Sequence, residues 1–282
     1  MVKKKAGLFL VLSVAIGLLV ALTAAGCGSN TVQAEEISGD LTLSGSTTVL
    51  PIAQEAADMF MDKNPNANVT VQGGGSSVGI TNVLEGIVDI GDSSRELKDD
   101  EKGKGLMDYE IAYDVITVIT NKDVPVDNLS AEQVKGIFTG KITNWKDVGG
   151  ADATIVVVVR DSASGTREMF DEKALSKEKP VGGAIETNSN GIMRQTVSST
   201  PRSIGYVSLG YVDSSVKTLK YNGVEGTIDT ALAKSYPLAR YLHMFTKGEA
   251  TGLAKSFIDY ILSDDFQNDV VAKEYVPMTR AG

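Results

Sequence analysis

From residue 41 onwards, short apolar runs alternate with longer segments whose apolar residues recur every three to four positions. The short runs are rich in Val, Ile and Leu and predict strands at 41–43, 69–71, 88–91, 115–120 and 155–159. The run at 155–159 is almost purely β-branched, which is typical of a strand buried on both faces of a parallel sheet.

The longer segments have helical spacing, and proline suits a first helical turn. They predict a helix from Pro51 to Asn64, one marked by Val78, Val83, Leu84 and Ile87, one over 131–138, and one carrying Met169 and Phe170. Strands that alternate with helices indicate an α/β fold, in which ligands bind at the carboxyl ends of strands. The continuous α/β pattern favours two lobes with a cleft between them.

Three loops rich in Gly, Ser and Thr stand where a predicted strand passes into a helix. They are Gly45-Ser46-Thr47-Thr48, Gly73-Gly74-Gly75-Ser76-Ser77 and Ser162-Ala163-Ser164-Gly165-Thr166. Each offers hydroxyls and free N–H groups at the positive end of a helix, an arrangement that holds tetrahedral oxyanions. The pattern predicts capture of an anion, with neutral donors replacing its water.

Ser and Thr are also ordinary N-caps, so any one loop alone is equally explained by capping. Three such loops, with arginines at two strand ends, favour a shared site. Arg160 is the better candidate because it follows a buried strand and its planar fork suits two oxygens of an anion. Arg95 and Arg167 could equally form salt bridges between the lobes.

The N-terminal sequence indicates where in the cell the protein acts. Three lysines precede an apolar stretch that ends in small residues before Cys27, which predicts a signal peptide over 1–26. A membrane-spanning helix is the alternative for this stretch. The cysteine position resembles a lipobox, so we expect Cys27 to carry the lipid anchor, 27–38 to form a flexible tether, and the rest to lie on the extracytoplasmic face of the membrane.

Without residues 1–26 the chain has 24 basic against 36 acidic residues, which argues against nucleic-acid partners. Its one histidine, His243, lies in an apolar stretch and is expected to be packed rather than catalytic. Neither a Ser-His-Asp set nor a His/Cys cluster is present in the sequence, so we expect no enzyme activity, no metal and no cofactor. Nucleotide binding is also disfavoured, because Ile142 follows Lys141 where a P-loop needs Ser or Thr.

Several motifs together resemble the substrate-binding lipoproteins of bacterial phosphate ABC importers, a type II periplasmic-binding-protein family. The resemblance covers nearly all of 41–280, and the motifs that carry it are 45–51, 73–79, 89–95, 160–167, 138–145, 204–206 and 236–238. It implies a monomer of two α/β lobes that closes on inorganic phosphate and delivers it to membrane permease subunits. The implied lobes are 39–115 with 238–282, and 116–237.

Carried over by position, the resemblance assigns a set of residues to the phosphate site. The set is Thr48, Ser76, Arg160, Ser164, Gly165 and Thr166, with Ser46, Thr47, Ser77, Ser94, Arg95 and Asp161 adjoining.

One position departs from the family pattern. Some members place an aspartate where this chain has Ser94, and that carboxylate accepts the ligand's proton. Phosphate carries a proton near neutral pH and sulfate does not, so such an acceptor tells them apart. Asp161 or Asp92 could substitute, and Asp161 is favoured because it adjoins Arg160. Receptors for sulfate or molybdate, a phosphate-sensing surface protein and a secreted phosphatase are the alternative functions.

Overall fold

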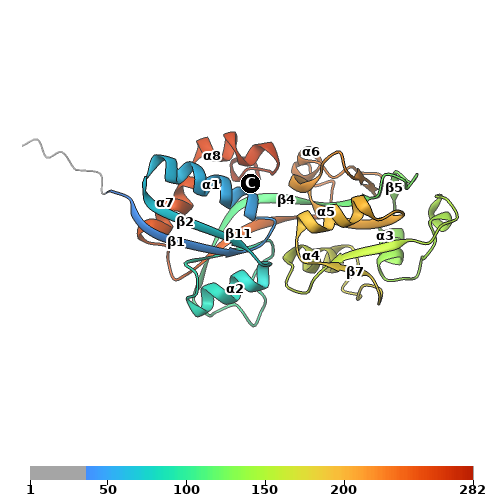
Figure 1. Ribbon diagram of the computed structural model, residues 1–282, viewed down its shortest axis with the longest axis horizontal. Coiled ribbons are helices and arrows are strands. Elements are labelled where there is room, and N and C mark those ends of the chain that lie inside the picture. The colour runs from blue at the N-terminus through green and yellow to red at the C-terminus, as the bar shows by residue number, and fades with distance from the viewer. Residues whose placement is uncertain (1–35, 282) are drawn as a thin grey trace, which may run out of the picture. The chain divides into compact units, whose positions relative to one another are not determined.

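The computed structural model describes residues 36–281, which fold into two lobes joined by long strands (Figure 1). The predicted signal peptide, Cys27 and most of the tether lie outside the described residues. None of the helices within 36–281 is both long and apolar enough to cross a membrane.

The elements that precede and include the long strand β4 are, in chain order, β1 (Ser38–Gly45), α1 (Leu50–Lys63), β2 (Asn66–Gly73), α2 (Ser76–Glu85), β3 (Ile90–Ser93) and β4 (Leu106–Thr120). The elements from β11 to the C-terminus are β11 (Ala239–Lys247), α7 (Gly252–Ile261), α8 (Asp264–Asp269), the 3-10 turn η3 (Val271–Lys273) and α9 (Met278–Ala281).

The elements between β4 and β11 make the second lobe. They are β5 (Asn128–Leu129), α3 (Ala131–Phe138), η1 (Trp145–Val148), β6 (Val156–Arg160), α4 (Gly165–Lys173), β7 (Ile185–Thr187), α5 (Asn190–Ser199), β8 (Ser203–Ser208), η2 (Leu209–Tyr211), β9 (Lys217–Thr218), β10 (Lys220–Tyr221) and α6 (Ile228–Leu232).

One mixed sheet runs through both lobes in the order β2-β1-β3-β11-β4-β8-β6-β7, with β9 beside β4. β1 lies parallel to β2 and β3, and β6 lies parallel to β7 and β8. β4 joins the lobes, because its first part pairs with β11 and its last part pairs with β8. The parallel strands therefore direct their carboxyl ends, and the loops that follow them, to the junction between lobes (Figure 1).

Each lobe has its own buried core. In the first lobe, Leu43, Ile90 and Met244 of the sheet pack against Phe60 of α1 and Phe257 of α7. A core of this kind orders β1 and α1, and with them the loop between the two. The first predicted anion loop is thus attached to a rigid frame.

In the second lobe, Phe170 of α4 stacks on Tyr206 of β8, with ring centroids 4.0 Å apart, and Phe138 meets Phe170 edge-on. The hydroxyl of Tyr206 accepts a hydrogen bond from the N–H of Arg160 at 3.2 Å. This aromatic cluster therefore fixes the end of β6 and the start of α4, which flank the third predicted loop.

Most predicted elements are confirmed, including the helix over 131–138 and the parallel strand at 155–159, observed as β6. The prediction for Ile87 is wrong. α2 ends at Glu85 because Gly86 takes the left-handed conformation, with φ of 71°. Ile87 consequently lies beyond the helix and is 62% exposed.

Candidate functional site

The predicted hydroxyl residues meet where the two lobes face each other. Ser46, Thr47 and Thr48 precede α1, Ser76 begins α2, and Thr166 lies in the first turn of α4. All five, together with Ser94 and Ser164, are buried, whereas Ser77 is only half-buried. The first N–H groups of a helix have no partner within it, so three helix ends direct donors toward this junction.

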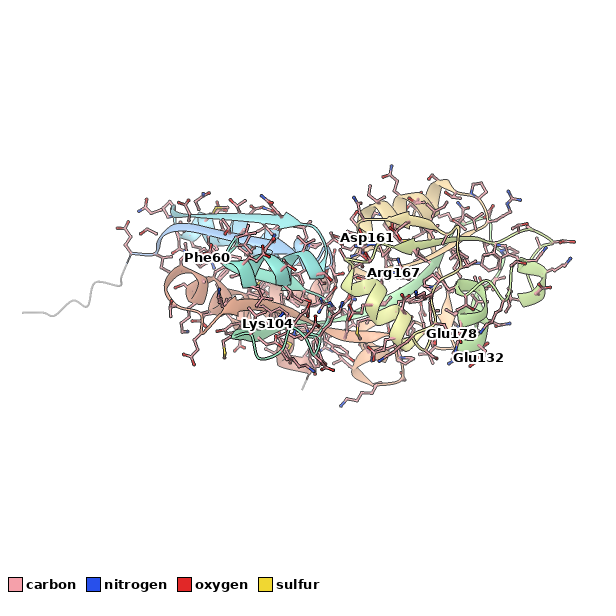
Figure 2. The ribbon with its side chains drawn as sticks, turned by 90° about the horizontal axis from the view of Figure 1, so that it is seen from below. Phe60, Lys104, Glu132, Asp161, Arg167 and Glu178 are labelled. Carbon is pink, nitrogen blue, oxygen red and sulfur yellow. The ribbon has the colours of Figure 1, made fainter. Side chains whose placement is uncertain are left out.

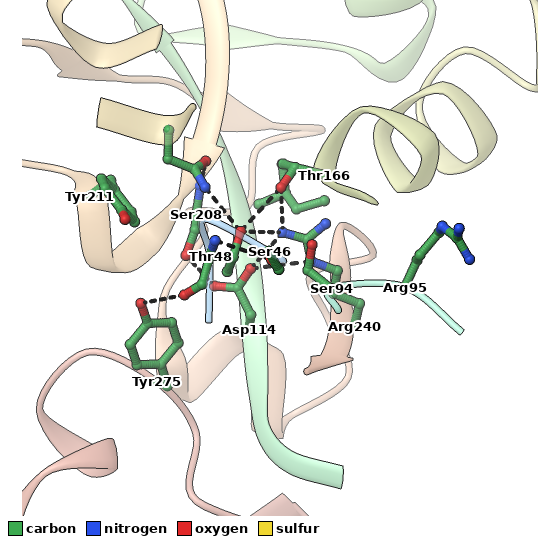
Figure 3. A network of polar contacts seen from close by, with 12 residues as sticks. Ser46, Thr48, Ser94, Arg95, Asp114, Thr166, Ser208, Tyr211, Arg240 and Tyr275 are labelled. Carbon is green, nitrogen blue, oxygen red and sulfur yellow. Dashed lines mark hydrogen bonds and ion pairs between the residues drawn. The ribbon is translucent and has the colours of Figure 1, made fainter. Parts of the chain in front are cut away.

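Thr48 and Thr166 join the lobes directly. Their hydroxyl oxygens lie 3.1 Å apart, and Thr48 is fully buried. Arg240 of β11 donates through Nη2 to both hydroxyls, at 3.2 Å to Thr48 and 2.8 Å to Thr166 (Figure 3). Asn190 adds a further donor from α5, with Nδ2 2.9 Å from the Thr48 hydroxyl.

Ser76 and Ser94 form a second hydroxyl pair, with oxygens 3.2 Å apart. The N–H of Ser94 also donates to Ser76 Oγ at 3.0 Å. Both hydroxyls lie directly against Gly165, the first residue of α4. A methyl group at Gly165 would stand 2.4 Å from Ser76 Oγ and 2.9 Å from Ser94 Oγ. Glycine is therefore required for the lobes to approach this closely.

Arg160 ends β6 with its side chain almost fully buried. Its Nη2 donates to the carbonyl of Asn188 at 3.2 Å, while its Nε has no hydrogen-bond partner within the described part of the chain. Burial lowers the pKa of Arg160, and nearby Tyr206 and Asp161 oppose that shift. A buried guanidinium with a free donor is suited to bind an anion.

The structure places Arg95 outside this hydroxyl cluster (Figure 3). Glu101 holds its guanidinium at 2.7 and 2.8 Å, and Glu168 of α4 pairs with its Nε at 3.1 Å. The side chain of Ser77 is turned the same way and accepts from Arg95 at 3.3 Å. Arg95 of the first lobe therefore forms a salt bridge to the second lobe through Glu168, as the alternative prediction held. Since Glu101 and Glu168 already neutralise its charge, Arg95 is less suited to bind an anion. The prediction that Arg167 could also link the lobes is wrong: among residues 36–281 its ion pairs are with Asp171 and Glu186 of its own lobe.

Asp161, the proton acceptor favoured in the sequence, lies in the loop that directly follows β6. Its Oδ1 accepts from the N–H of Ala163 in its own loop, at 3.2 Å. It lies with Arg167 at the end of the second lobe that faces the first (Figure 2). Ser164 caps α4, because its Oγ accepts from the N–H of Arg167 at 3.1 Å. Ser46 similarly accepts from the N–H of Thr48, which leaves the proton of each hydroxyl available to a ligand.

Sequence reasoning missed the charged pair at the centre of the site. Asp114 of β4 accepts from Arg240 Nη2 at 3.0 Å and from the Ser208 hydroxyl at 2.6 Å. Burial raises the pKa of Asp114 and lowers that of Arg240, and each charge opposes the shift of the other. A signal was present, since Asp114 is the one carboxylate in the otherwise mostly apolar stretch 111–120, and Arg240 closely follows the motif at 236–238.

Asn190, Tyr211 and Tyr275 were also missed. The hydroxyl of Tyr211 donates to the carbonyl of Thr47 at 2.6 Å. The hydroxyl of Tyr275 donates to the carbonyl of Thr48 at 3.1 Å (Figure 3). These residues hold the backbone of the first loop in place. Their sequence surroundings carry no pattern that separates them from ordinary core residues.

The prediction that His243 is a packed residue is confirmed. His243 is 2% exposed, stacks on Phe245 and contacts Asp108 at 2.8 Å. No group of three or more metal-ligating side chains is found among residues 36–281.

Comparisons with known proteins place this geometry in a family. The model of the PBP superfamily domain matches residues 30–265. The phosphate-binding protein PstS of Bacillus subtilis is 39% identical over 98% of this chain and 95% of its own length. The chain belongs to the PstS family of the PBP superfamily. Another PstS relative, from Borreliella burgdorferi, is 33% identical over 83% of this chain and 88% of its own length.

Solved structures related to the PstS family share the fold. A Clostridium perfringens structure with bound phosphate, described as a phosphate ABC transporter substrate-binding protein, is 42% identical with a TM-score of 0.82. It is matched over its full length and over 85% of this chain. An ABC-type phosphate transport receptor from Vibrio cholerae, 33% identical, has a TM-score of 0.71 with the same coverage.

Proposed function

We propose that this protein is an extracytoplasmic receptor that binds inorganic phosphate between its lobes and delivers it to an ABC importer. The single observation that supports this most is the convergence of Thr48 and Ser76 from one lobe with Thr166 from the other. The PstS relatives and the phosphate-bound structure support the choice of ligand.

The proposed ligand set consists of donors from both lobes. Hydroxyls, helix N-termini and one free guanidinium each contribute, and a hydrogen bond to a charged group is worth about 1.5–3 kcal/mol. Several of them together reach the roughly −8 kcal/mol that micromolar binding needs. The proposed set is Ser46, Thr47, Thr48, Ser76, Ser94, Arg160, Ser164, Gly165 and Thr166, with Arg240 and Asn190 holding the threonines.

Titration calorimetry of the purified, phosphate-free full chain tests this function. We expect saturable binding of phosphate with a dissociation constant of about 1 μM or lower. Tighter binding of sulfate or molybdate would assign another oxyanion, and no binding of any of them would contradict the proposal. We also propose that the protein turns over no phosphoester, which the same preparation tests with a chromogenic phosphomonoester.

The anchor and the lobe boundaries belong to the same proposal. We expect lipid attachment at Cys27, so Cys27→Ser should move the protein from the membrane fraction to the soluble fraction of the producing cell. Retention in the membrane fraction would contradict lipidation at this residue. The proposed lobes are 39–115 with 238–282, and 116–237. The two hydrophobic cores support these boundaries, because along β4 and β11 the residues change from one core to the other near Val115 and Ala239.

A further inference from the structure

A cluster of four charged side chains bridges the lobes beside the proposed site. Arg95, Lys98 and Glu101 belong to the segment between β3 and β4 in the first lobe, and Glu168 belongs to α4 in the second. Glu168 Oε2 lies 3.1 Å from Arg95 Nε and 3.0 Å from Lys98 Nζ. One carboxylate of the second lobe therefore pairs with two cations of the first.

The cluster is joined to the proposed ligand residues through the chain on both sides, although Arg95 itself stands apart from the hydroxyls (Figure 3). Arg95 directly follows Ser94, and Glu168 lies three residues after Gly165, about one turn along the same helix. Because α4 is one continuous helix, the approach of the lobes that brings Gly165 against the first lobe also brings Glu168 to its two cations.

Glu101 compensates the charge of Arg95 from within the first lobe. It accepts from both terminal nitrogens of Arg95, at 2.7 and 2.8 Å. The Arg95 side chain is 2% exposed and that of Glu101 is 14% exposed. Separation of the lobes would therefore remove only Glu168 from Arg95 and would leave no buried charge without a partner. The contact made by Glu168 can thus break without the large penalty of an unpaired buried ion.

The pair of Glu168 and Lys98 is open to solvent, with side chains 37% and 43% exposed. Dissolved ions reach such groups, and the Debye length falls from about 30 Å at 0.01 M to about 3 Å at 1 M ionic strength. The attraction of Glu168 to the first lobe should consequently weaken as salt is added. The neutral contact between the Thr48 and Thr166 hydroxyls, which also joins the lobes, carries no such dependence.

We propose that Glu168 is an electrostatic latch, which holds the lobes together through Arg95 and Lys98 and thereby slows the release of phosphate. The latch rests on the proposed function, because it assumes that phosphate is held between the lobes. The apparent affinity of a ligand scales with the fraction of the protein in the binding-competent arrangement. Glu168 is a positioning residue in this account, since it acts through α4 and not by contact with the anion.

Phosphate binding to the full chain with Glu168→Gln tests the latch. The amide keeps the size of the side chain and removes its charge, so we expect the affinity measured by calorimetry to fall about fivefold. The change should lie in the dissociation rate, measured by chasing bound radiolabelled phosphate with unlabelled phosphate. The affinity of the wild type should also decrease more steeply with added sodium chloride than that of the variant.

Glu186→Gln is the matched control. Glu186 belongs to the second lobe and pairs with Arg167 of the same lobe at 3.2 Å. This variant loses the same charge but no contact between the lobes, so its dissociation rate and salt dependence should equal those of the wild type. A general change in repulsion between the acidic protein and the anion would instead alter both variants alike.

Lys98→Met tests whether the effect passes through the described pair. It should lower phosphate affinity about twofold in the wild type and leave it unchanged in the Glu168→Gln background, since coupled residues are not additive. Additive effects of the two substitutions would overturn the latch, as would a dissociation rate and salt dependence in Glu168→Gln equal to those of the wild type. Either result would leave the proposed function intact. Absence of phosphate binding by the wild type would instead refute the proposed function.

Discussion

Replacing Gly165 with alanine is expected to lower phosphate affinity by about a hundredfold or more while the protein remains folded. The added methyl group would stand 2.4 Å from Ser76 Oγ and 3.1 Å from Ser76 Cβ, in the opposite lobe. Either the Ser76 hydroxyl turns away or the lobes stay apart, and both outcomes remove hydrogen bonds to the anion worth about 1.5–3 kcal/mol each. Calorimetry with phosphate measures the loss.

Gly182→Ala is the matched control for this variant, because nothing lies within 4 Å of a methyl group there. Its affinity should equal that of the wild type. Alanine is also favoured over glycine in a helix, so Gly165→Ala should not lower the thermal midpoint. If Gly165→Ala binds phosphate within about threefold of the wild type, about 0.65 kcal/mol, the close approach of the lobes at α4 is not part of binding.

Replacing Arg240 with methionine is expected to reduce the free energy of unfolding by about 3–5 kcal/mol, because it leaves Asp114 buried without its cation. Both side chains are at most 2% exposed and lie 3.0 Å apart. The double variant Asp114→Asn with Arg240→Met should recover most of that stability, since no uncompensated charge remains. Urea denaturation measures the free energy of unfolding of the single and the double variant. Phosphate affinity should fall in both variants, because Thr48 and Thr166 lose Arg240 as their shared donor.

Arg194→Met provides the comparison at a more exposed pair. Arg194 and Asp213 are 2.8 Å apart, but their side chains are 33% and 46% exposed. Such pairs contribute about 0–1 kcal/mol. If Arg240→Met destabilises the protein no more than Arg194→Met does, the pair at the centre of the site is not a structural requirement.

Local features of the sequence predicted much of this architecture. Pro51 indicated the start of α1, and Asn64 is the C-cap at its end. Ser and Thr before predicted helices indicated the three loops, because capping and anion capture use the same helix-end donors. These signals are short-range, so they can be read from neighbouring residues. The two-lobed fold followed from the family resemblance and from the alternation of strands and helices.

What the sequence did not reveal depends on pairing between distant positions. Arg240 contacts Thr48 across 192 positions of the chain, and Asn190 contacts the same hydroxyl across 142. Arg95 resembled a ligand residue by its place after a strand, yet Glu101 and Glu168 neutralise it. Only the three-dimensional arrangement shows that Arg95 and Arg240 already have carboxylate partners, whereas Arg160 forms no ion pair among the described residues.

A crystal structure of the protein with phosphate tests the central claim most directly. We predict a phosphate ion between the lobes, with its oxygens in hydrogen-bond contact with Ser76 and Ser94 of one lobe and with Gly165 and Thr166 of the other. A phosphate ion bound to one lobe alone, with these four residues free of contact to it, would contradict the account.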